Sequence, residues 1–141
     1  MRTWQPFTAK ETASRVIGWL PHVVDCPNDK SGLTERLSGC ENYLLTDGDE
    51  DLGWMALQQA DAWGICGFVI RPEFRNRWLS REVLRSFADK VFTPTRPVVL
   101  FDTKVPEVLK LALRLGAKRV YDSGVNGQYG LTADSLKGRL H

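Results

Sequence analysis

Apolar positions in the first forty residues follow two patterns, one typical of a strand and one of a helix. The segment 2–7 favours a short first strand. Thr8 and Glu11 then form a capping box, in which Thr8 accepts from the amide three residues on and the Glu11 side chain reaches back. Spacings of three and four predict a helix with one buried face, formed by Ala13, Val16, Ile17 and Leu20. Pro21 ends this helix, and residues 33–37 predict another short one.

The next thirty residues show no helical period and predict three strands. We place these strands at residues 43–46, 54–58 and 64–70. The acidic segment 47–51 forms the first hairpin turn and residues 59–61 form the second. The acidic segment has two interpretations, a solvated turn or a metal site. The solvated turn is favoured, because the segment lacks the ligand spacing and terminal glutamate of a calcium loop.

An apolar run that stops at Arg71 and Pro72 leads through a short polar loop into an amphipathic helix. The buried side of this helix consists of Leu79, Val83, Leu84, Phe87, Ala88 and Val91. Its other side carries Arg77, Arg81 and Arg85 at intervals of four, which predicts a basic ridge. Strand, polar loop and helix N-terminus together are suited to bind phosphate, since the first amides of a helix have no intrahelical partner. We therefore expect the segment 75–81 to bind the phosphates of a nucleotide-like cofactor.

The remaining third of the chain completes a sheet. Residues 98–101 predict a strand, Pro106 suits the start of a helix and Gly116 its end. Residues 118–121 and 128–132 predict two last strands, joined by a turn at 125–127. A meander interrupted by strand–helix–strand connections implies an α/β (α+β) fold. Its mixed, mainly antiparallel, twisted sheet carries helices on both faces, in a single domain over residues 1–141.

Composition narrows the class of protein. The 141 residues are 43% hydrophobic and 26% charged, as in an ordinary globular domain. A net charge of +2 is too small to favour a nucleic-acid partner, although the basic ridge leaves that as a third hypothesis. Three cysteines without a CxxC pair indicate a reducing, cytoplasmic setting. No segment has the length of a membrane span, so we expect no membrane association.

From residue 41 onward the chain resembles the GCN5-related N-acetyltransferase (GNAT) superfamily. The segment IRPEFRNRWLSREVLRSF is similar to the family segment that ends a strand, passes a proline and an arginine, and enters the helix that cradles the pyrophosphate of acetyl-CoA. The segment LFDTKVPEVLKLALRLGAKRVY is similar to a later strand–helix segment of the family. The Arg-x-Arg-Trp-Leu-Ser sequence resembles that of small phage-encoded GNAT-like proteins, which implies a host cytoplasm as the setting.

The resemblance implies an N-acetyltransferase that uses acetyl-CoA and acts on an amine of a small molecule or protein. Val69 and Ile70 would pair with the pantetheine arm, and the Ile70 amide would polarise the thioester carbonyl. The cofactor-binding set would also contain the pyrophosphate amides, the Ser80 hydroxyl and the arginines that reach the outer phosphates: Arg75, Asn76, Arg77, Trp78, Leu79, Ser80 and Arg81.

The departures from the family pattern support an alternative. Trp78 and Ser80 replace two glycines, Val105 stands where asparagine is common, and Ala112 stands where many members carry a tyrosine acid. These departures favour a catalytically inactive GNAT-like structural or host-interaction protein. Candidates for a catalytic role are Glu73, His22, His141, Tyr121, Tyr129 and Cys66, and none is assigned. A C-terminal edge strand also offers a surface for a homodimer.

Overall fold

Seven strands form one sheet in a computed structural model that describes residues 1–19, 29–59, 63–75, 77–102, 113–123, 126–132 and 134. The strands are β1 (Arg2–Phe7), β2 (Glu41–Asp47), β3 (Glu50–Gln59), β4 (Trp63–Ile70), β5 (Val98–Asp102), β6 (Lys118–Ser123) and β7 (Asn126–Thr132). Their order in the sheet is β1-β2-β3-β4-β5-β7-β6. β4 and β5 are parallel and all other neighbours are antiparallel, so the expected mixed, mainly antiparallel sheet is confirmed.

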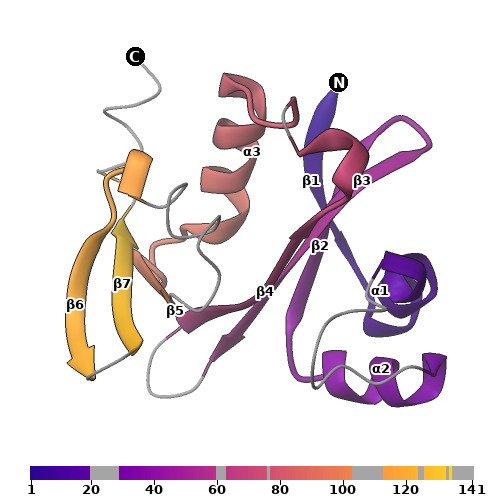
Figure 1. The fold of residues 1–141 in the computed structure, drawn as a ribbon, viewed down its shortest axis with the longest axis horizontal. Helices are drawn as coiled ribbons and strands as arrows, with labels where there is room; N and C mark the ends of the chain where they lie inside the picture. The colour runs from indigo at the N-terminus through magenta and orange to yellow at the C-terminus, as the bar shows by residue number, and fades with distance from the viewer. Residues whose placement is uncertain are drawn as a thin grey trace.

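Helices cover both faces of this sheet (Figure 1). Those that lie wholly within the described residues are α1 (Ala9–Val16), the 3-10 turn η1 (Ile17–Trp19), α2 (Lys30–Leu37), the 3-10 turn η2 (Pro72–Phe74) and α3 (Arg81–Val91). α1 and α2 lie on one side of β2–β4 and α3 lies on the other. Each side has its own apolar cluster: Leu33, Leu44 and Trp54 belong to the first, and Met55 and Phe87 to the second. In the described part of the chain, no helix is long and apolar enough to cross a bilayer.

Side-chain caps begin α1, α2 and α3. Thr8 accepts from the Glu11 amide at 3.2 Å, and Asp29 accepts from the Gly32 amide at 2.9 Å. The second half of the predicted capping box is wrong, because the Glu11 carboxylate accepts from Arg15 at 3.1 Å, one helical turn on. α1 ends at Val16 and passes into η1, before the predicted end at Pro21; residues 20–28 lie outside the described part.

The predicted elements of the sheet are present with shifted ends. β2, β3 and β4 extend the three predicted strands by one to four residues at an end. The first turn is therefore shorter than predicted, with Gly48 at a φ of 63° that glycine adopts without strain. Gly116, with a φ of 88°, ends a helical segment, and its amide donates to the Leu113 carbonyl at 3.1 Å. The predicted start of that helix at Pro106 and parts of the two remaining turns, at residues 60–61 and 125, lie outside the described residues.

Candidate functional site

β4 and β5 separate after a very short paired stretch. Only Gly64 with Leu100 and Ile65 with Phe101 are paired. On its other side β4 continues along β3, with a register shift that leaves Cys66 as the extra residue of a β-bulge. Beyond the bulge, the β4 edge that faces β5 has no strand partner among the described residues. The two strands diverge there, as the predicted cofactor site requires (Figure 1).

The direction of the β4 peptide groups follows from one hydrogen bond. The Arg71 amide donates to the Leu52 carbonyl at 2.9 Å, and this bond extends the β3–β4 register by one residue beyond the pair Gly53 and Ile70. Because peptide groups alternate in direction along a strand, those of Val69 also point to β3. Those of Phe68 and Ile70 point the other way, to the open edge. The open edge of β4 therefore presents the N–H and C=O groups of these two residues.

A tight turn around Phe74 connects β4 to the loop before α3. The Phe74 ring is buried, and the guanidinium carbons of Arg71 and Arg77 lie 5.7 and 5.8 Å from its centroid. Arg71 also pairs with Glu73 at 2.8 Å. Within the turn the Arg75 amide donates to the Pro72 carbonyl at 3.4 Å, and the Arg77 amide to the Phe74 carbonyl at 3.1 Å. The Arg77 amide, which was predicted to bind the pyrophosphate, is thus already used within the turn.

The N-terminus of α3 keeps free amides beside this turn. Ser80 is its N-cap: the hydroxyl accepts from the Val83 amide at 3.2 Å and the carbonyl from the Leu84 amide at 3.0 Å. Ser80 is therefore the residue that begins α3. Among the described residues, no acceptor is found for the amides of 78–82. Unpaired amides and the positive end of a helix dipole favour a bound anion.

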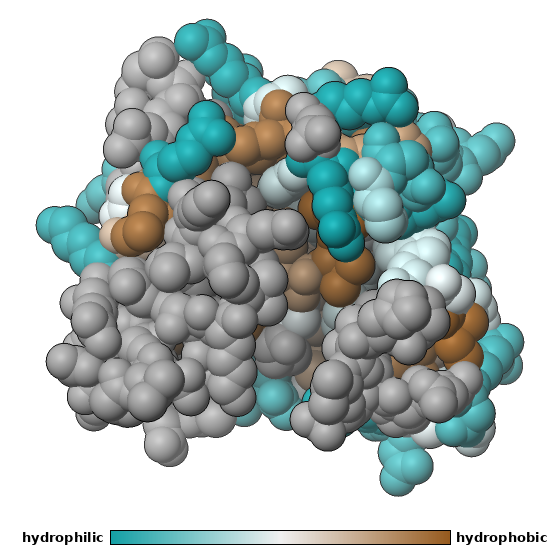
Figure 2. All heavy atoms as spheres, in the orientation of Figure 1, coloured by the Kyte–Doolittle hydropathy of each residue, from teal (hydrophilic) through white to brown (hydrophobic). Residues whose placement is uncertain are grey.

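Trp78, which replaces a family glycine, packs inward from this loop. Its ring is half-buried, and its centroid lies 5.8 Å from that of Phe68. The Phe68 ring lies in turn 5.8 Å from Trp4, whose side chain is buried. The indole therefore joins the apolar cluster on the α3 face. Figure 2 shows apolar side chains on the floor of a hollow near the middle of the view, with hydrophilic side chains on its upper rim.

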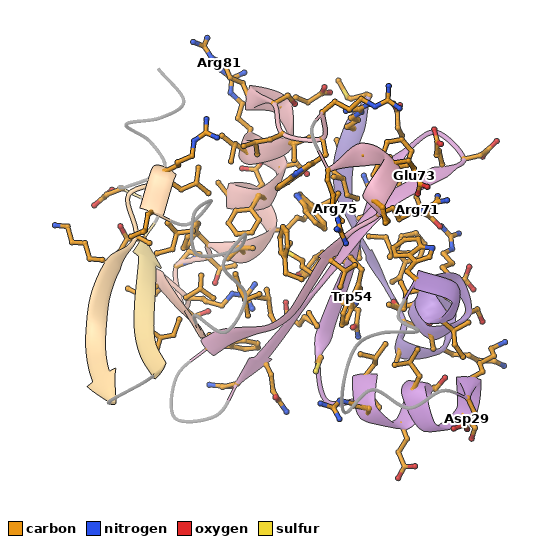
Figure 3. The ribbon with its side chains drawn as sticks, viewed as in Figure 1. Asp29, Trp54, Arg71, Glu73, Arg75 and Arg81 are labelled. Carbon is orange, nitrogen blue, oxygen red and sulfur yellow. The ribbon has the colours of Figure 1, made fainter. Side chains whose placement is uncertain are left out.

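The three predicted phosphate-binding arginines have different surroundings. The exposed Arg75 lies against β4, where its Nε donates to the Ile70 carbonyl at 3.3 Å (Figure 3). Arg77 is stacked on Phe74, and its carbonyl accepts from Arg2. Arg81 is exposed and projects away from the fold at the start of α3. The predicted basic ridge is wrong in one respect: Arg77 precedes α3, so it does not continue the helical face of Arg81 and Arg85.

The opposite face of β4 contains a contact that sequence reasoning missed. A Cβ atom at Gly67 would lie 2.4 Å from Cη2 of Trp54, so the buried indole covers this glycine. The indole N–H donates to the Asn42 side chain at 3.2 Å, and Asn42 donates to the Leu37 carbonyl at 3.1 Å. A glycine inside an apolar strand is the only signal in the sequence for such an approach. The contact fixes β4 at the residue that follows the bulge.

Two carboxylates of the acidic turn between β2 and β3 pair with cations. Asp47 accepts from the N-terminal ammonium at 3.0 Å, which lowers the pKa of its carboxyl, and Arg15 donates to Asp51 at 3.1 Å. These residues line a hollow of about 490 Å³ together with Trp19 and Arg71. No group of three or more potential metal ligands is found in the part of the chain that the structure describes. The structure thus gives cation partners to Asp47 and Asp51.

A buried arginine supports the other end of the sheet. The guanidinium of Arg96 is 5% exposed and donates to Glu41 at 2.8 Å and to the carbonyls of Lys90 and Val91 at the end of α3. Burial raises the pKa of Glu41, but hydrogen bonds from Arg96 and Tyr43 outweigh it, so the pKa lies below its ordinary value of 4.5. Burial and the bond to Glu41 raise the pKa of Tyr43.

The structure places few of the candidate catalytic groups. Glu73 is exposed and pairs with Arg71. The remaining candidates lie outside the described residues or have side chains outside them: His22, His141, Tyr121, Tyr129 and Cys66. Positions 76, 105 and 112 are also outside this part of the chain. No general acid or base is therefore assigned.

The arrangement of the sheet matches solved acetyltransferase structures. The sequence itself matches no protein-family model and no curated protein. An acetyltransferase from Thermus thermophilus has a TM-score of 0.70 at 17% identity, over 94% of this chain and 99% of that one. The ribosomal-protein-S18-alanine N-acetyltransferase from Escherichia coli has 0.67 at 15%, over 94% of each chain. Mutant forms of the spermidine/spermine N-acetyltransferase from Vibrio cholerae have 0.71 at 12%, over 100% of each.

These likenesses show a shared fold and nothing finer, because the sequence identities are too low to transfer a function. The chain has the GNAT fold, and the prediction of that fold from the phosphate-loop segment and the element order is confirmed. The resemblance to phage-encoded proteins, the predicted homodimer and the predicted cofactor-binding residues stay predictions.

Proposed function

We propose that this chain is an N-acetyltransferase that uses acetyl-CoA and acetylates an amine of a small molecule or protein directly, within a single domain in the cytoplasm. One observation carries the proposal: β4 and β5 separate after two residue pairs, and the open edge ends beside the N-terminus of α3. An extended thioester can add to such an edge as a strand does. Its phosphates would then reach the free amides of 78–82.

In this proposal the chain orients the thioester and stabilises charge on it. The pantetheine arm pairs with the peptide groups of Phe68 and Ile70, the two that face the open edge. The Ile70 N–H donates to the thioester oxygen as negative charge develops there. The amides of 78–82 bind the pyrophosphate, with Arg75, Arg77 and Arg81 as candidates for the outer phosphates. Phe68 takes the pairing role that was predicted for Val69, because the peptide groups of Val69 point to β3.

The reaction requires a neutral amine. An alkylammonium first gives a proton to water or to a base; the amine nitrogen then bonds to the thioester carbon and the carbon–sulfur bond breaks. The nitrogen loses a second proton, and the departing thiolate takes one up, so each turnover yields amide, CoA thiol and one released proton. No described residue is assigned as the acid, which is consistent with Ala112 at the family's tyrosine position.

The alternative is a GNAT-fold protein without catalysis that acts as a structural or host-interaction protein. A specific observation favours it: Trp78 stands where the family has a glycine, and its ring fills space against Phe68 next to the phosphate loop. The proposal needs this ring to lie on the inner side of the loop and leave the amides exposed. The half-buried position of the ring in the apolar cluster on the α3 face meets that need.

An acetyl-transfer assay separates the two. Thiol release from acetyl-CoA is followed with spermidine, a peptide with a free N-terminus, and a lysine peptide as acceptors, and acetylated products are identified by mass spectrometry. Amine-dependent thiol release above the hydrolysis background supports the enzyme. Binding of acetyl-CoA without transfer to any amine supports a fold that has kept its ligand and lost its reaction. Absence of both supports the interaction protein.

A further inference from the structure

The Ile70 carbonyl on the open edge of β4 is covered by an arginine side chain. Arg75 Nε donates to this carbonyl at 3.3 Å. The carbonyl faces away from β3, so it is the acceptor that an amide N–H of an added strand would use. A ligand that pairs with this edge competes with the guanidinium for this carbonyl.

Arg75 is suited to move because little else restrains it. Its side chain is exposed, and no carboxylate pairs with it in the described part of the chain. Its neighbours are held elsewhere: Arg71 pairs with Glu73, and both Arg71 and Arg77 stack on Phe74. Figure 3 shows Arg75 beside β4, whereas Arg81 points away from the fold.

We propose that Arg75 determines which thioester carrier the open edge accepts, favouring carriers with phosphates over carriers without them. The inference rests on the proposed function of the same edge. When the carrier has phosphates, the guanidinium exchanges a neutral carbonyl for an anionic oxygen, and such charge-assisted bonds are the stronger ones. A phosphate-free pantetheine thioester displaces the same guanidinium and offers no anion in return.

The size of the effect follows from the bond that is lost. The loss of one hydrogen bond of ordinary net strength changes a binding constant by about twofold to tenfold. Arg75 should therefore weaken the binding of a phosphate-free carrier by about this factor, while it strengthens the binding of acetyl-CoA. Removing the side chain should move the two affinities in opposite directions, which a residue that only binds phosphate cannot do.

Calorimetric titration of acetyl-CoA and of S-acetylpantetheine tests this, with the wild-type chain, Arg75→Ala and Arg85→Ala. The control removes another exposed arginine, on α3, and should change both dissociation constants by less than about twofold. For Arg75→Ala we expect acetyl-CoA to bind about tenfold more weakly and S-acetylpantetheine to bind about twofold to tenfold more tightly. Thermal melting of each variant checks that the fold is intact.

The outcomes separate the two proposals. In one outcome the wild-type chain binds acetyl-CoA, and Arg75→Ala weakens this binding without tightening the binding of S-acetylpantetheine. Arg75 is then a phosphate ligand only, so the proposed carrier selection is overturned while the proposed function stands. If the wild-type chain binds neither thioester, the proposed function fails, and the role of Arg75 fails with it.

Discussion

Replacing Gly67 by alanine places a methyl group against the Trp54 indole at the point where β4 leaves β5. The added Cβ would lie 2.4 Å from Cη2 and 2.8 Å from Cζ3 of the ring, closer than carbon atoms approach. The ring is 6% exposed and its N–H donates to Asn42, so it has little room to move. Overpacking of this kind costs about 1–3 kcal/mol, and disturbing the hydrogen bond adds about 1 kcal/mol.

We therefore expect Gly67→Ala to lower the free energy of unfolding by about 2–4 kcal/mol, from the packing and hydrogen-bond terms together. For a domain of this size that corresponds to a fall in melting temperature of about 6–15 °C. Urea denaturation measures the free energy directly. A matched control is Gly18→Ala, because no atom of the described residues, apart from its chain neighbours, lies within 4 Å of a Cβ at Gly18. The control should stay within about 0.5 kcal/mol of the wild type.

A double-mutant cycle isolates the contact. Trp54→Phe removes the six-membered part of the indole, which supplies the contacting atoms, and destabilises on its own because Asn42 loses its donor. On the Trp54→Phe background, Gly67→Ala should cost less than about 1 kcal/mol, which gives a coupling energy of about 1–3 kcal/mol. Additive costs, or a Gly67→Ala variant as stable as the wild type, would refute the reasoning about this contact.

Two further predictions concern α3 and the Glu41 network. Ser80→Ala removes the cap from the Val83 amide and should destabilise the fold by about 1 kcal/mol, measured by urea denaturation, with Ser80→Asp retaining most of the stability; an unchanged midpoint for Ser80→Ala would contradict the capping role. Because the pKa of Glu41 is lowered in the fold, its ionised form stabilises the protein above about pH 4.5, and this contribution is lost as the pH falls through the lowered pKa. Glu41→Gln should therefore flatten the acid side of the stability curve, and an unchanged acid slope in melting experiments from pH 3 to 7 would argue against it.

Local patterns in the sequence were enough to predict the strand–loop–helix unit of the site. The end of an apolar run at Arg71, the polar loop and the apolar period of α3 are all local signals, and Ser80 is a residue type that favours the N-cap. The mixed sheet with helices on both faces followed from the sequence of elements. These features depend on neighbouring residues in the chain, which is why they can be read from one sequence.

Contacts between distant segments could not be predicted in this way. Trp54 reaches Gly67 only because the two strands pair in a register that includes the bulge at Cys66, and a shift by one residue would turn the glycine to the other face. The burial of Arg96 depends equally on distant partners, the Glu41 carboxylate and the last carbonyls of α3. Arg75 was predicted to bind phosphate, and its contact with the Ile70 carbonyl depends on the turn around Phe74.

The central claim is that an acetyl-CoA molecule binds where β4 leaves β5 and α3 begins. Thermal melting with and without acetyl-CoA tests it most directly. A ligand present at a hundred times its dissociation constant stabilises a fold by about 2.7 kcal/mol, so we expect the melting temperature to rise by about 5–10 °C. An unchanged melting temperature at millimolar acetyl-CoA would contradict the claim.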